Sequence, residues 1–430
     1  MRPAPLDWLF SLAQFGIKFG LDNIRAVLAE LGSPERQYPS IHVAGTNGKG
    51  SVTAIVETAL RRAGYRTGRY TSPHLLDLSE RFAIDGVPVG QAQMLAAVTR
   101  VQDAVERLQA RGVLEVHPTF FEITTAVAFV LFREAGVDVA VCEVGLGGRL
   151  DATNVLSPVA CAITSIGVDH QQYLGNTLAE IAAEKAGIIK PQIPVVMGPV
   201  GAEARAVIEA RAAAVGAPIV DALAGTTLGD SAPANTPGQR FTLTTAAREY
   251  GAVHLALEGV HQRSNAAVAV RLLETLDAAG LRIGADAIRE GLQLVQWPGR
   301  MQTIRLGQRE VLLDAAHNVD GAAALAQYLE RRGAPRPLVF AAMRDKDASE
   351  MLARILPQAS RLIVTRASNP RSAEPADLAA VARRVAPALP IHTAEPVADA
   401  LELAWQSDSR IVVAGSIFLL ADVMKELGRS

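Results

Sequence analysis

The chain has 430 residues, of which 49% are hydrophobic and 20% are charged. This length exceeds what one hydrophobic core usually organises, and the composition is too apolar for a disordered protein, so we expect a folded protein of two domains or of three small ones. The formal net charge of -2, without long runs of one charge sign, argues against nucleic acid or a membrane surface as a partner.

The N-terminal segment MRPAPLDWLFSLAQFG contains Asp7 and lacks both the longer apolar run and the small-residue cleavage site of a signal peptide. No stretch of the sequence approaches the roughly 18 apolar residues that a membrane-spanning helix needs. Cys142 and Cys161 lie within apolar stretches, which is typical of small core residues and not of a disulfide framework. We therefore expect a cytoplasmic protein in a reducing compartment.

Short apolar runs alternate with Ala- and Leu-rich helical patterns along the chain. This alternation is typical of parallel strands joined by crossover helices. A helix is expected over 51–63, directly after the first strand, and hairpins peripheral to the main sheet are expected over about 222–260. The strands predicted for the first part of the chain are 41–45, 137–145, 159–167 and 193–198.

Pro298 and Gly299 interrupt the helical pattern, and a second series of apolar runs follows them. The runs are REVLLDAAHN, PLVFAAM, RLIVTRAS, IHTAE and RIVVAGS. We therefore predict an α/β protein with two domains. The first is a P-loop-type domain over 1–298 with a mostly parallel sheet, and the second is a smaller Rossmann-like α/β domain over 299–430.

A glycine-rich turn leads from the strand at 41–45 into the following helix. Its glycines let backbone N–H groups face a phosphate, and the helix N-terminus adds its positive dipole end. A lysine supplies charge, and a serine hydroxyl can reach a magnesium ion. The nucleotide-binding residues predicted in this turn are Asn47, Gly48, Lys49, Gly50 and Ser51.

The turn departs from the standard spacing G-x-x-x-x-G-K-[ST]. Val43 stands where the first glycine would be, and Gly50 separates Lys49 from Ser51. We interpret the turn as a variant phosphate-binding loop. The alternative is a glycine-rich connection between a strand and a helix that carries an ordinary surface lysine.

The sequence HVAGTNGKGS resembles the nucleotide loop of the Mur ligase superfamily, and more closely that of the folylpolyglutamate synthases and dihydrofolate synthases. Further blocks similar to those of the family follow in the family's order, namely TSPHL, HPTFFE, EVGLGGRLDATN, SIGVDH, EKAGIIK, DAAHN and MRDKD. Together they span most of the chain. The resemblance implies a Mur-ligase-like architecture with ATP and two magnesium ions as cofactors, and we expect a monomer.

Candidate metal ligands follow neighbouring strands. Glu143 ends one predicted strand, Asp169 and His170 follow the next, and Ser72 follows the run YRTGRYT. A hydroxyl, a carboxylate and an imidazole at the carboxyl edge of a sheet can hold a magnesium ion that bridges nucleotide phosphates. The resemblance matches Ser72, Glu143 and His170 to metal ligands and gives Ser51 to a second ion. Without the family, a histidine after a strand is more often a hydrogen-bonded structural residue.

Lys185 lies in EKAGIIK, on a segment with a helical pattern where an isolated lysine is usually solvated. The resemblance matches it to a lysine that captures carbon dioxide as a carbamate and so becomes an anion that supports a metal ion. This chemistry requires neighbours that hold the amine partly neutral. A carbamylated Lys185 is therefore a hypothesis, and the predicted catalytic residues are Lys49, His170 and Lys185.

The segment TFFE places two adjacent aromatic rings beside polar groups, which suits stacking on a flat heteroaromatic ring. Paired phenylalanines are also common as plain core residues. The resemblance matches this segment and part of LDATN to the family's pterin contacts. The predicted substrate residues are Thr119, Phe120, Phe121, Glu122, Leu150, Asp151 and Ala152.

Polar residues also follow the first predicted strand of the C-terminal domain, at the edge where a ligand would face the other domain. By resemblance, Asn265, Arg300 and Asp314 contact ATP, and His317 lies at the same edge. Arg300 would neutralise phosphate charge when the domains close. For the charged residues of MRDKD at 343–347, a solvated turn is the alternative interpretation.

The reaction that the resemblance implies is ATP-dependent amide formation. A substrate carboxylate attacks the γ-phosphate to give an acyl phosphate, and the α-amine of glutamate then attacks the activated carbonyl. Positioning and charge neutralisation are sufficient for the protein's part in this chemistry. The expected substrates are dihydropteroate, folates and L-glutamate, which combine dihydrofolate synthase and folylpolyglutamate synthase activities.

Four alternatives stay open. The protein could have folylpolyglutamate synthase activity alone, or be a peptidoglycan Mur-type ligase, a P-loop kinase or GTPase, or a non-catalytic binding protein of the same fold. The 40 residues before Ile41 are too few for the nucleotide-sugar domain that a peptidoglycan ligase usually carries there. A P-loop kinase or GTPase would not explain TSPHL, EVGLGGRLDATN or the second domain.

Overall fold

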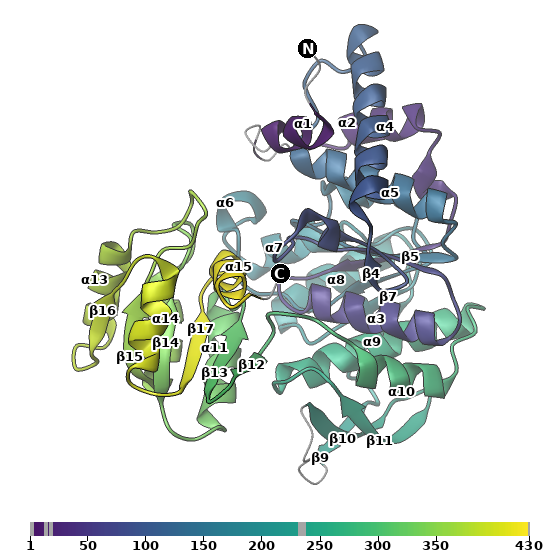
Figure 1. The fold of residues 1–430 in the computed structure, drawn as a ribbon. Coiled ribbons are helices and arrows are strands. Elements are labelled where there is room, and N and C mark those ends of the chain that lie inside the picture. Colours follow the sequence, from purple (N-terminus) through teal and green to yellow (C-terminus); the bar gives the residue numbers. More distant parts are fainter. Residues whose placement is uncertain (1–3, 13–15, 17–19, 231–237, 429–430) are drawn as a thin grey trace.

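The computed structural model describes residues 4–12, 16, 20–230 and 238–428. Parts of the predicted N-terminal segment, at 1–3 and 13–15, and of the predicted hairpin region, at 231–237, lie outside these residues. The described chain forms an eight-stranded, a three-stranded and a six-stranded sheet. Figure 1 shows the six-stranded sheet and its helices beside a larger part that carries the other two sheets. The α/β fold class predicted from the sequence is confirmed.

The main sheet of the N-terminal domain is mostly parallel. Six neighbouring strands, from β2 to β8 across the sheet, run parallel, and β3 and β4 add an antiparallel edge. In spatial order the strands are β4 (Val87–Pro88), β3 (Phe82–Ile84), β2 (Thr67–Tyr70), β5 (Val139–Glu143), β1 (Ser40–Ala44), β6 (Ala160–Ile163), β7 (Val195–Met197) and β8 (Ile219–Asp221).

The four strands predicted in this domain are confirmed as β1, β5, β6 and β7, and the predicted helix over 51–63 is α3 (Lys49–Arg62). The observed strands are shorter than the apolar runs. The strand in the run at 159–167 ends at Ile163. The Thr164 N–H still donates to the Ala44 carbonyl of β1 at 2.9 Å, but the hydroxyls of Thr164 and Ser165 bond to the glycine-rich turn. The shortened ends are therefore the places where the site is built.

Successive side chains of a strand point to opposite faces, so each central strand serves two cores. Ile41 and Val43 of β1 pack with α3, α9 and α10 on one face. On the other face, Cys142 packs with α4 and α5, and Cys161 packs with α7 and α8. Both cysteines are free and buried, as predicted. The helices besides α3 are α1 (Pro5–Ser11), α2 (Asp22–Glu30), α4 (Gln91–Ala110), α5 (Phe120–Ala135), α6 (Gln171–Leu174), α7 (Leu178–Ala186), α8 (Ala202–Ala214), α9 (His261–Ala278) and α10 (Ala285–Leu294).

The predicted hairpins form a three-stranded antiparallel sheet of β9 (Thr227–Asp230), β10 (Gln239–Thr244) and β11 (Glu249–Leu255). One face of β10 is apolar, and Phe241 and Leu243 on that face are fully buried in the core that α3 and α9 share. This small sheet therefore packs beneath α3, the helix that begins at the glycine-rich turn, and beneath α9, as the view in Figure 1 shows.

The sheet of the C-terminal domain has parallel strands with one antiparallel edge, where β12 pairs with β13. In spatial order its strands are β12 (Gln302–Leu306), β13 (Arg309–Asp314), β17 (Arg410–Ala414), β14 (Arg336–Phe340), β15 (Ala359–Val364) and β16 (Ile391–Thr393). The helices that cover it are α11 (Val319–Glu330), α12 (Ala348–Ile355), α13 (Pro375–Val385), α14 (Val397–Trp405) and α15 (Ile417–Glu426).

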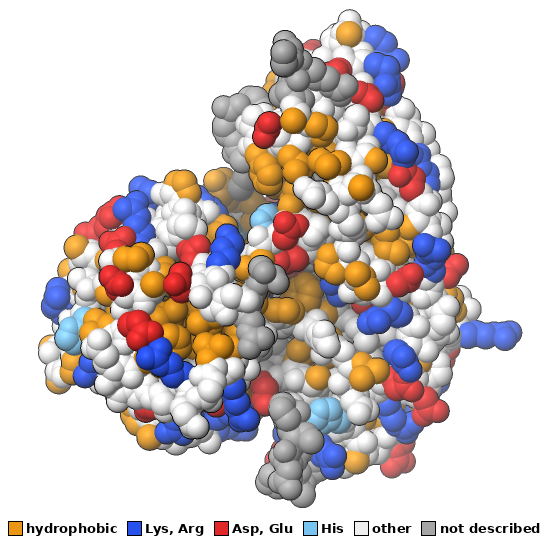
Figure 2. All heavy atoms as spheres, viewed as in Figure 1, with side chains coloured by type: hydrophobic (Ala, Val, Ile, Leu, Met, Phe, Trp, Pro, Cys, Tyr) orange, Lys and Arg blue, Asp and Glu red, His pale blue; other side chains and the backbone are white. Residues whose placement is uncertain are grey.

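The two domains meet along one side and leave a notch between them, which Figure 2 shows toward the top of the view. Hydrophobic side chains gather on the part of the N-terminal domain beside this notch. Among the described residues, no helix is long and apolar enough to cross a membrane.

Candidate functional site

A cavity of about 380 Å³ lies where the carboxyl ends of β1, β5 and β6 face the end of β13 from the other domain. Parallel α/β sheets bind ligands at this edge because the loops that leave the strands converge there. All of the predicted nucleotide, metal and catalytic residues line this one cavity. They are Asn47, Gly48, Lys49, Gly50, Ser51, Ser72, Glu143, His170, Lys185, Asn265, Arg300, Asp314 and His317.

The glycine-rich turn is held from its neighbour strand. The backbone N–H of Thr46 donates to the Ser165 carbonyl at 2.8 Å, and the Thr46 hydroxyl is 3.0 Å from both the N–H and the carbonyl of Gly167. The hydroxyls of Thr164 and Ser165 donate to the Asn47 carbonyl at 2.6 and 3.0 Å. The segment after β6 therefore fixes the shape of the turn before any ligand binds.

Gly48 and Lys49 occupy the start of α3. Gly48 has φ of +86°, a left-handed conformation, and a Cβ atom there would lie 2.3 Å from the Asn265 side-chain oxygen, so only glycine suits this position. The Lys49 ammonium donates to the carbonyls of Gly45 and Thr46 at 3.0 and 3.1 Å. These two carbonyls hold the lysine over the turn, where its charge faces the cavity.

Glu143 closes β5 and brings a carboxylate into the cavity with little solvent, since the residue is 5% exposed. Burial raises the pKa of Glu143 to about 6, against the opposing effect of Lys49. The hydrogen bond that it accepts from the Ser72 backbone N–H is long, at 3.3 Å. A buried carboxylate with so few donors has lone pairs available for a cation.

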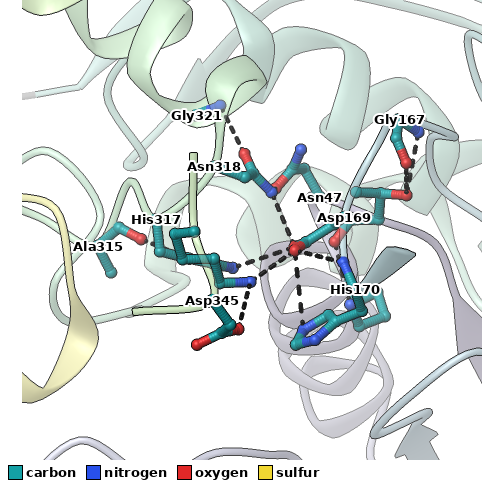
Figure 3. A network of polar contacts seen from close by, with 12 residues as sticks. Asn47, Gly167, Asp169, His170, Ala315, His317, Asn318, Gly321 and Asp345 are labelled. Atoms are coloured by element: carbon teal, nitrogen blue, oxygen red, sulfur yellow. Dashed lines mark hydrogen bonds and ion pairs between the residues drawn. The ribbon is translucent and has the colours of Figure 1, made fainter. Parts of the chain in front are cut away.

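Asp169 is the centre of a polar network that joins the two domains (Figure 3). Its carboxylate lies 2.5 Å from the Lys346 ammonium and 3.7 Å from His317 Nε2, and it accepts a hydrogen bond of 3.1 Å from the Asn318 amide. The same Asn318 amide donates to the Asn47 side-chain oxygen at 3.0 Å. Residues of the C-terminal domain are thus bonded to the glycine-rich turn itself.

The environment of Asp169 keeps its charge. Burial opposes ionisation of this carboxyl, but the neighbouring His317, His170 and Lys346 hold its pKa far below the ordinary value. The side chains of Asp169 and Lys346 are 8% and 9% exposed, so the pair is shielded from solvent. Removing one partner of such a pair leaves an uncompensated buried charge.

His170 follows Asp169 with φ of +50°, and its ring points into the network in Figure 3. Burial lowers the pKa of His170 to about 4, so the imidazole is neutral at physiological pH. A neutral imidazole is the form that can bind a metal ion.

Lys185 is buried on α7, at 4% exposure, and its ammonium donates to the Gly45 carbonyl at 2.9 Å. Burial lowers the pKa of Lys185 to about 7, and the nearby charge of Lys49 acts in the same direction. This lysine is not a solvated side chain. Near neutral pH a substantial fraction of the amine is uncharged and nucleophilic.

In the C-terminal domain, Asp314 ends β13 and accepts hydrogen bonds from the backbone N–H groups of Met301 and Ala316, both at 2.9 Å. Burial raises the pKa of this carboxyl. Arg300 lines the cavity beside it and donates to the Gly299 carbonyl at 3.2 Å. Asp314 therefore fixes the connection that carries Arg300.

The predicted substrate segment TFFE lies outside this cavity, at the start of α5. Thr119 and Glu122 form a reciprocal capping box, in which each side chain accepts a hydrogen bond from the other's backbone N–H. Phe120 stacks on Phe10 at 6.2 Å between ring centroids, and the Phe121 ring lies against Gly145. The sequence pattern T-x-x-E carried this capping signal, which the aromatic interpretation did not use.

Asp151 is also engaged by the protein. It caps a short 3-10 helix at Ala152–Val155, accepts from Thr153 N–H at 3.0 Å and Leu146 N–H at 2.8 Å, and is buried. Leu150 and Ala152 flank it and, like Asp151, do not line the cavity. A pterin role for the TFFE segment and for residues 150–152 stays a prediction.

Among the described residues, no group of three or more His, Cys, Asp and Glu side chains is arranged to hold a metal ion. The predicted set instead supplies one carboxylate from Glu143, one imidazole from His170 and the hydroxyls of Ser51 and Ser72. Magnesium is commonly bound by one or two carboxylates, with waters and substrate phosphates completing its shell. The set fits a magnesium ion that arrives with a nucleotide and does not fit a metal held by protein groups alone.

The sequence placed Asp169 beside the candidate metal ligands and Asn318 at the strand end that faces the other domain, but it gave neither residue a part in joining the domains. It left Lys346 open as part of a solvated turn. The solvated alternative is wrong for Lys346, whose side chain is 9% exposed and paired with Asp169, whereas Asp345 and Asp347 are exposed. The signal was present in the order of the motifs. DAAHN and MRDKD follow β13 and β14, so both must emerge at the edge of the second sheet that faces the first.

Comparisons with known proteins agree with this architecture. Residues 91–273 match the Mur ligase middle domain, and residues 299–417 match the Mur ligase glutamate ligase domain. The chain is 36% identical over 425 residues to the Bacillus subtilis dihydrofolate synthase/folylpolyglutamate synthase, covering 98% of each chain. It is 34% identical over 418 residues to the Lacticaseibacillus casei folylpolyglutamate synthase, covering 94% of each.

Solved structures show the same likeness. A Mycobacterium tuberculosis folylpolyglutamate synthase complexed with ADP and AMPPCP matches with a TM-score of 0.91 and 35% identity over 99% of each chain. The E. coli FolC in complex with DHPP and ADP matches with a TM-score of 0.85 and 30% identity, over 99% of this chain and 98% of the other. Fold and site together define an ATP-dependent ligase of the Mur type. Within that class, the chain belongs to the dihydrofolate synthase/folylpolyglutamate synthase family.

Proposed function

We propose that this protein joins L-glutamate to dihydropteroate and to tetrahydrofolates, with ATP as the energy source and an acyl phosphate as the intermediate. The observation that carries the proposal is the single cavity in which the phosphate loop of one domain faces Arg300, Asp314 and His317 of the other. Such a cavity brings a nucleotide and two further substrates to one point, which a ligase needs and a binding protein does not.

In this proposal, the loop N–H groups and Lys49 bind the phosphates, and Arg300 approaches them from the linker between the domains. Asn265, Arg300, Asp314 and His317 contact the nucleotide. Relatives have been solved with ADP and AMPPCP, which supports a nucleotide here. The substrate carboxylate attacks the γ-phosphate, and the positive charge around the loop offsets the charge that develops on the transferred group.

Magnesium ions, when bound, would neutralise phosphate charge. We assign Ser51 to one ion and Ser72, Glu143 and His170 to the other. The free lone pairs of Glu143 and the neutral ring of His170 support this assignment. What the protein supplies is orientation, since Ser51 lies in the first turn of α3, Glu143 ends β5, and the turn before α3 is hydrogen-bonded before the nucleotide arrives.

We also propose that Lys185 reacts with carbon dioxide. Its buried amine has a pKa of about 7, so the uncharged form attacks the carbon of CO2 and loses one proton to give a carbamate. The product is an anion that a cation in the cavity can stabilise. Purified protein incubated with ¹³C-labelled bicarbonate should show a ¹³C NMR signal of the carbamate, and the Lys185→Arg variant should lack it. A metal-bound enzyme without that signal would contradict the proposal.

For the pterin we propose the surface beside Phe120, Phe121 and residues 150–152. The DHPP complex of E. coli FolC supports a pterin-type substrate for the family. Here Phe120 is partly exposed, and the Arg81 guanidinium carbon lies 5.4 Å from the centroid of the Phe120 ring. In this assignment Thr119, Glu122 and Asp151 hold the shape of the surface through their caps.

We further propose that the two domains divide at residues 298 and 299, that the enzyme acts as a monomer, and that it works in the cytoplasm. The short connection at Pro298 and Gly299 would allow the smaller domain to close over the phosphate loop.

The decisive experiment measures ADP release by purified protein with Mg-ATP and glutamate, with dihydropteroate, tetrahydrofolate, a UDP-muramoyl acceptor or no acceptor. We expect ADP release with both pterin substrates and a mass gain of one glutamate residue on each. A gain on tetrahydrofolate alone would reduce the function to folylpolyglutamate synthase. Turnover only with the muramoyl acceptor, or with none, would refute the proposal.

A further inference from the structure

Gly50 is one of the two departures of the phosphate loop from the standard spacing, because it separates Lys49 from Ser51. Gly50 lies in the first turn of α3 and is not among the residues with positive φ, so conformational freedom does not require a glycine there. Space does. A Cβ atom on Gly50 would lie 2.6, 2.8 and 2.9 Å from three atoms of the Trp297 indole.

Trp297 is itself held from a second side. The Arg69 guanidinium carbon lies 5.3 Å from the centroid of the Trp297 ring, a distance at which cation and ring attract each other. Arg69 is anchored in turn, since its Nη1 atom is 3.6 Å from a carboxylate oxygen of Glu57. Glu57 is fully buried on α3 and also accepts a hydrogen bond of 2.7 Å from the Thr67 hydroxyl.

Trp297 stands at the start of the connection between the domains. Arg300 is three residues further on, so the two Cα atoms are at most about 11 Å apart. Between them, the Gly299 N–H donates to Gln302 and the Gly299 carbonyl accepts from Ala315, both at 2.9 Å. The connection is therefore fixed to the C-terminal domain at Gly299 and to the phosphate-loop helix at Trp297.

We propose that Trp297 is a positioning residue for the ligase reaction. Its ring, seated on Gly50 and held by Arg69, sets the distance between the phosphate loop and Arg300. The extra glycine of the loop, Gly50, leaves the space that this ring occupies. The inference rests on the proposed function for what Arg300 does, while the contact between loop and ring stands on the geometry alone.

The test is a double-mutant cycle with Gly50→Ala and Trp297→Ala. A methyl group on Gly50 meets the ring, so Gly50→Ala should weaken ADP binding, measured by calorimetry, by at least about tenfold. In the Trp297→Ala background the same change should weaken ADP binding by less than about threefold. Equal effects of Gly50→Ala in both backgrounds would overturn the proposal, because they would show that the glycine serves only the phosphate.

Trp297→Phe guards against a variant that fails to fold, since it keeps an aromatic ring. We expect it to lower kcat more than it raises KM for the pterin substrate, because Arg300 is displaced while the acceptor site is untouched. Trp405→Phe is the matched control. Trp405 lies under another arginine, 4.7 Å from Arg309, but far along the chain in the C-terminal domain, and its replacement should leave kcat unchanged. Equal losses of kcat in both variants would contradict the positioning role.

Fluorescence gives a readout that does not depend on turnover. The chain has three tryptophans, and replacing Trp8 and Trp405 by Phe leaves Trp297 as the reporter. Its emission should change when ADP is added without glutamate or pterin, and Gly50→Ala should alter that change. A response to ADP in a protein without ligase activity would refute the proposed function and the role of Arg300 in it, while the contact between Gly50 and Trp297 would stand. An emission that ADP does not change would refute the inference itself.

Discussion

Each of the two facing sheets ends in a buried carboxylate, and the two carboxylates are used differently. Asp314, at the end of β13, accepts two backbone hydrogen bonds of 2.9 Å and thereby fixes the connection that carries Arg300. Glu143, at the end of β5, has one long hydrogen bond of 3.3 Å and faces Lys49 across the cavity. Equivalent places in two sheets thus give one acid that is fixed by two backbone bonds and one acid that has a single long bond to the protein.

The same contrast holds for the turns that follow the strands. After β1, the glycine-rich turn exposes N–H groups and the Lys49 charge to the cavity, which suits an anion. After β13, the turn instead places Asn318 as the N-cap of α11 and sends its amide across to Asn47 and Asp169. One edge is built to bind phosphate, and the other is built to reach the first.

The largest effect is expected at the phosphate side. Lys49→Ala should lower kcat about 100- to 1,000-fold, the range for removing one preorganised charge that stabilises a transition state. Within the part of the chain that the structure describes, the Lys49 ammonium bonds only to the carbonyls of Gly45 and Thr46, so thermal unfolding should change little. Glutamate-dependent ADP release and Tm are the two measurements. Near-normal turnover would remove Lys49 from the catalytic set.

The second-largest effect is expected at the Asp169–Lys346 pair, which joins the two domains. Lys346→Met leaves the buried charge of Asp169 without its nearest cation, and we expect a loss of about 3 kcal/mol in the free energy of unfolding. Adding Asp169→Asn removes the second charge, so the double variant should recover most of that loss. Denaturant unfolding of both variants decides the matter. A double variant that is less stable than Lys346→Met would show that the two side chains do not act as a pair.

Burial raises the pKa of both carboxyls, and Glu143→Gln isolates the effect of pH on one of them. The folded-state pKa of Glu143, about 6, lies above its ordinary value of 4.5. Because the unfolded chain ionises first as pH rises through this window, wild-type stability falls by about 2 kcal/mol and stays lower above pH 6.

Glu143→Gln should therefore be more stable than the wild type by up to about 2 kcal/mol at pH 8, and the gain should vanish below pH 4.5. Turnover at pH 8 should be lost, since the amide is a poor ligand for magnesium. Urea unfolding at the two pH values checks the stability. A gain that persists at pH 4 would mean that ionisation is not its cause.

Asn318→Ser should have the smallest effect. Serine keeps the N-cap of α11 but cannot reach Asn47 and Asp169. We expect a loss of about 1 kcal/mol in unfolding free energy and a few-fold rise in KM for ATP. Asn318→Ala serves as the comparison, because it removes the cap as well and should cost more. If both variants are equally stable, the Asn318 side chain does not cap α11, and the turn after β13 does not differ from the turn after β1 in this way.

Much of this molecule could be predicted from its sequence. Apolar runs and turn residues located the central strands and the helix after the phosphate loop, because burial and helix capping leave strong local signals. Every residue predicted for nucleotide, metal or catalysis lines one cavity, since strand ends of a parallel sheet share an edge.

What the sequence did not predict depends on contacts between distant segments. The Asp169–Lys346 pair joins positions 177 residues apart, and charged residues within a polar motif look the same whether they are solvated or paired. The capping box at Thr119 and Glu122 was local and readable, but two adjacent phenylalanines suggested a ligand first. Nothing in the sequence indicated the role of Trp297, because its ring packs against Gly50, a residue without a side chain.

The short segment after β6 has a thermodynamic consequence. Its first residues, Thr164 and Ser165, shape the phosphate loop, and Asp169, a few residues on, holds the C-terminal domain. One stretch of backbone thus takes part both in nucleotide binding and in docking of the C-terminal domain. By linkage, any factor by which docking of the C-terminal domain tightens the nucleotide equals the factor by which the nucleotide tightens that docking.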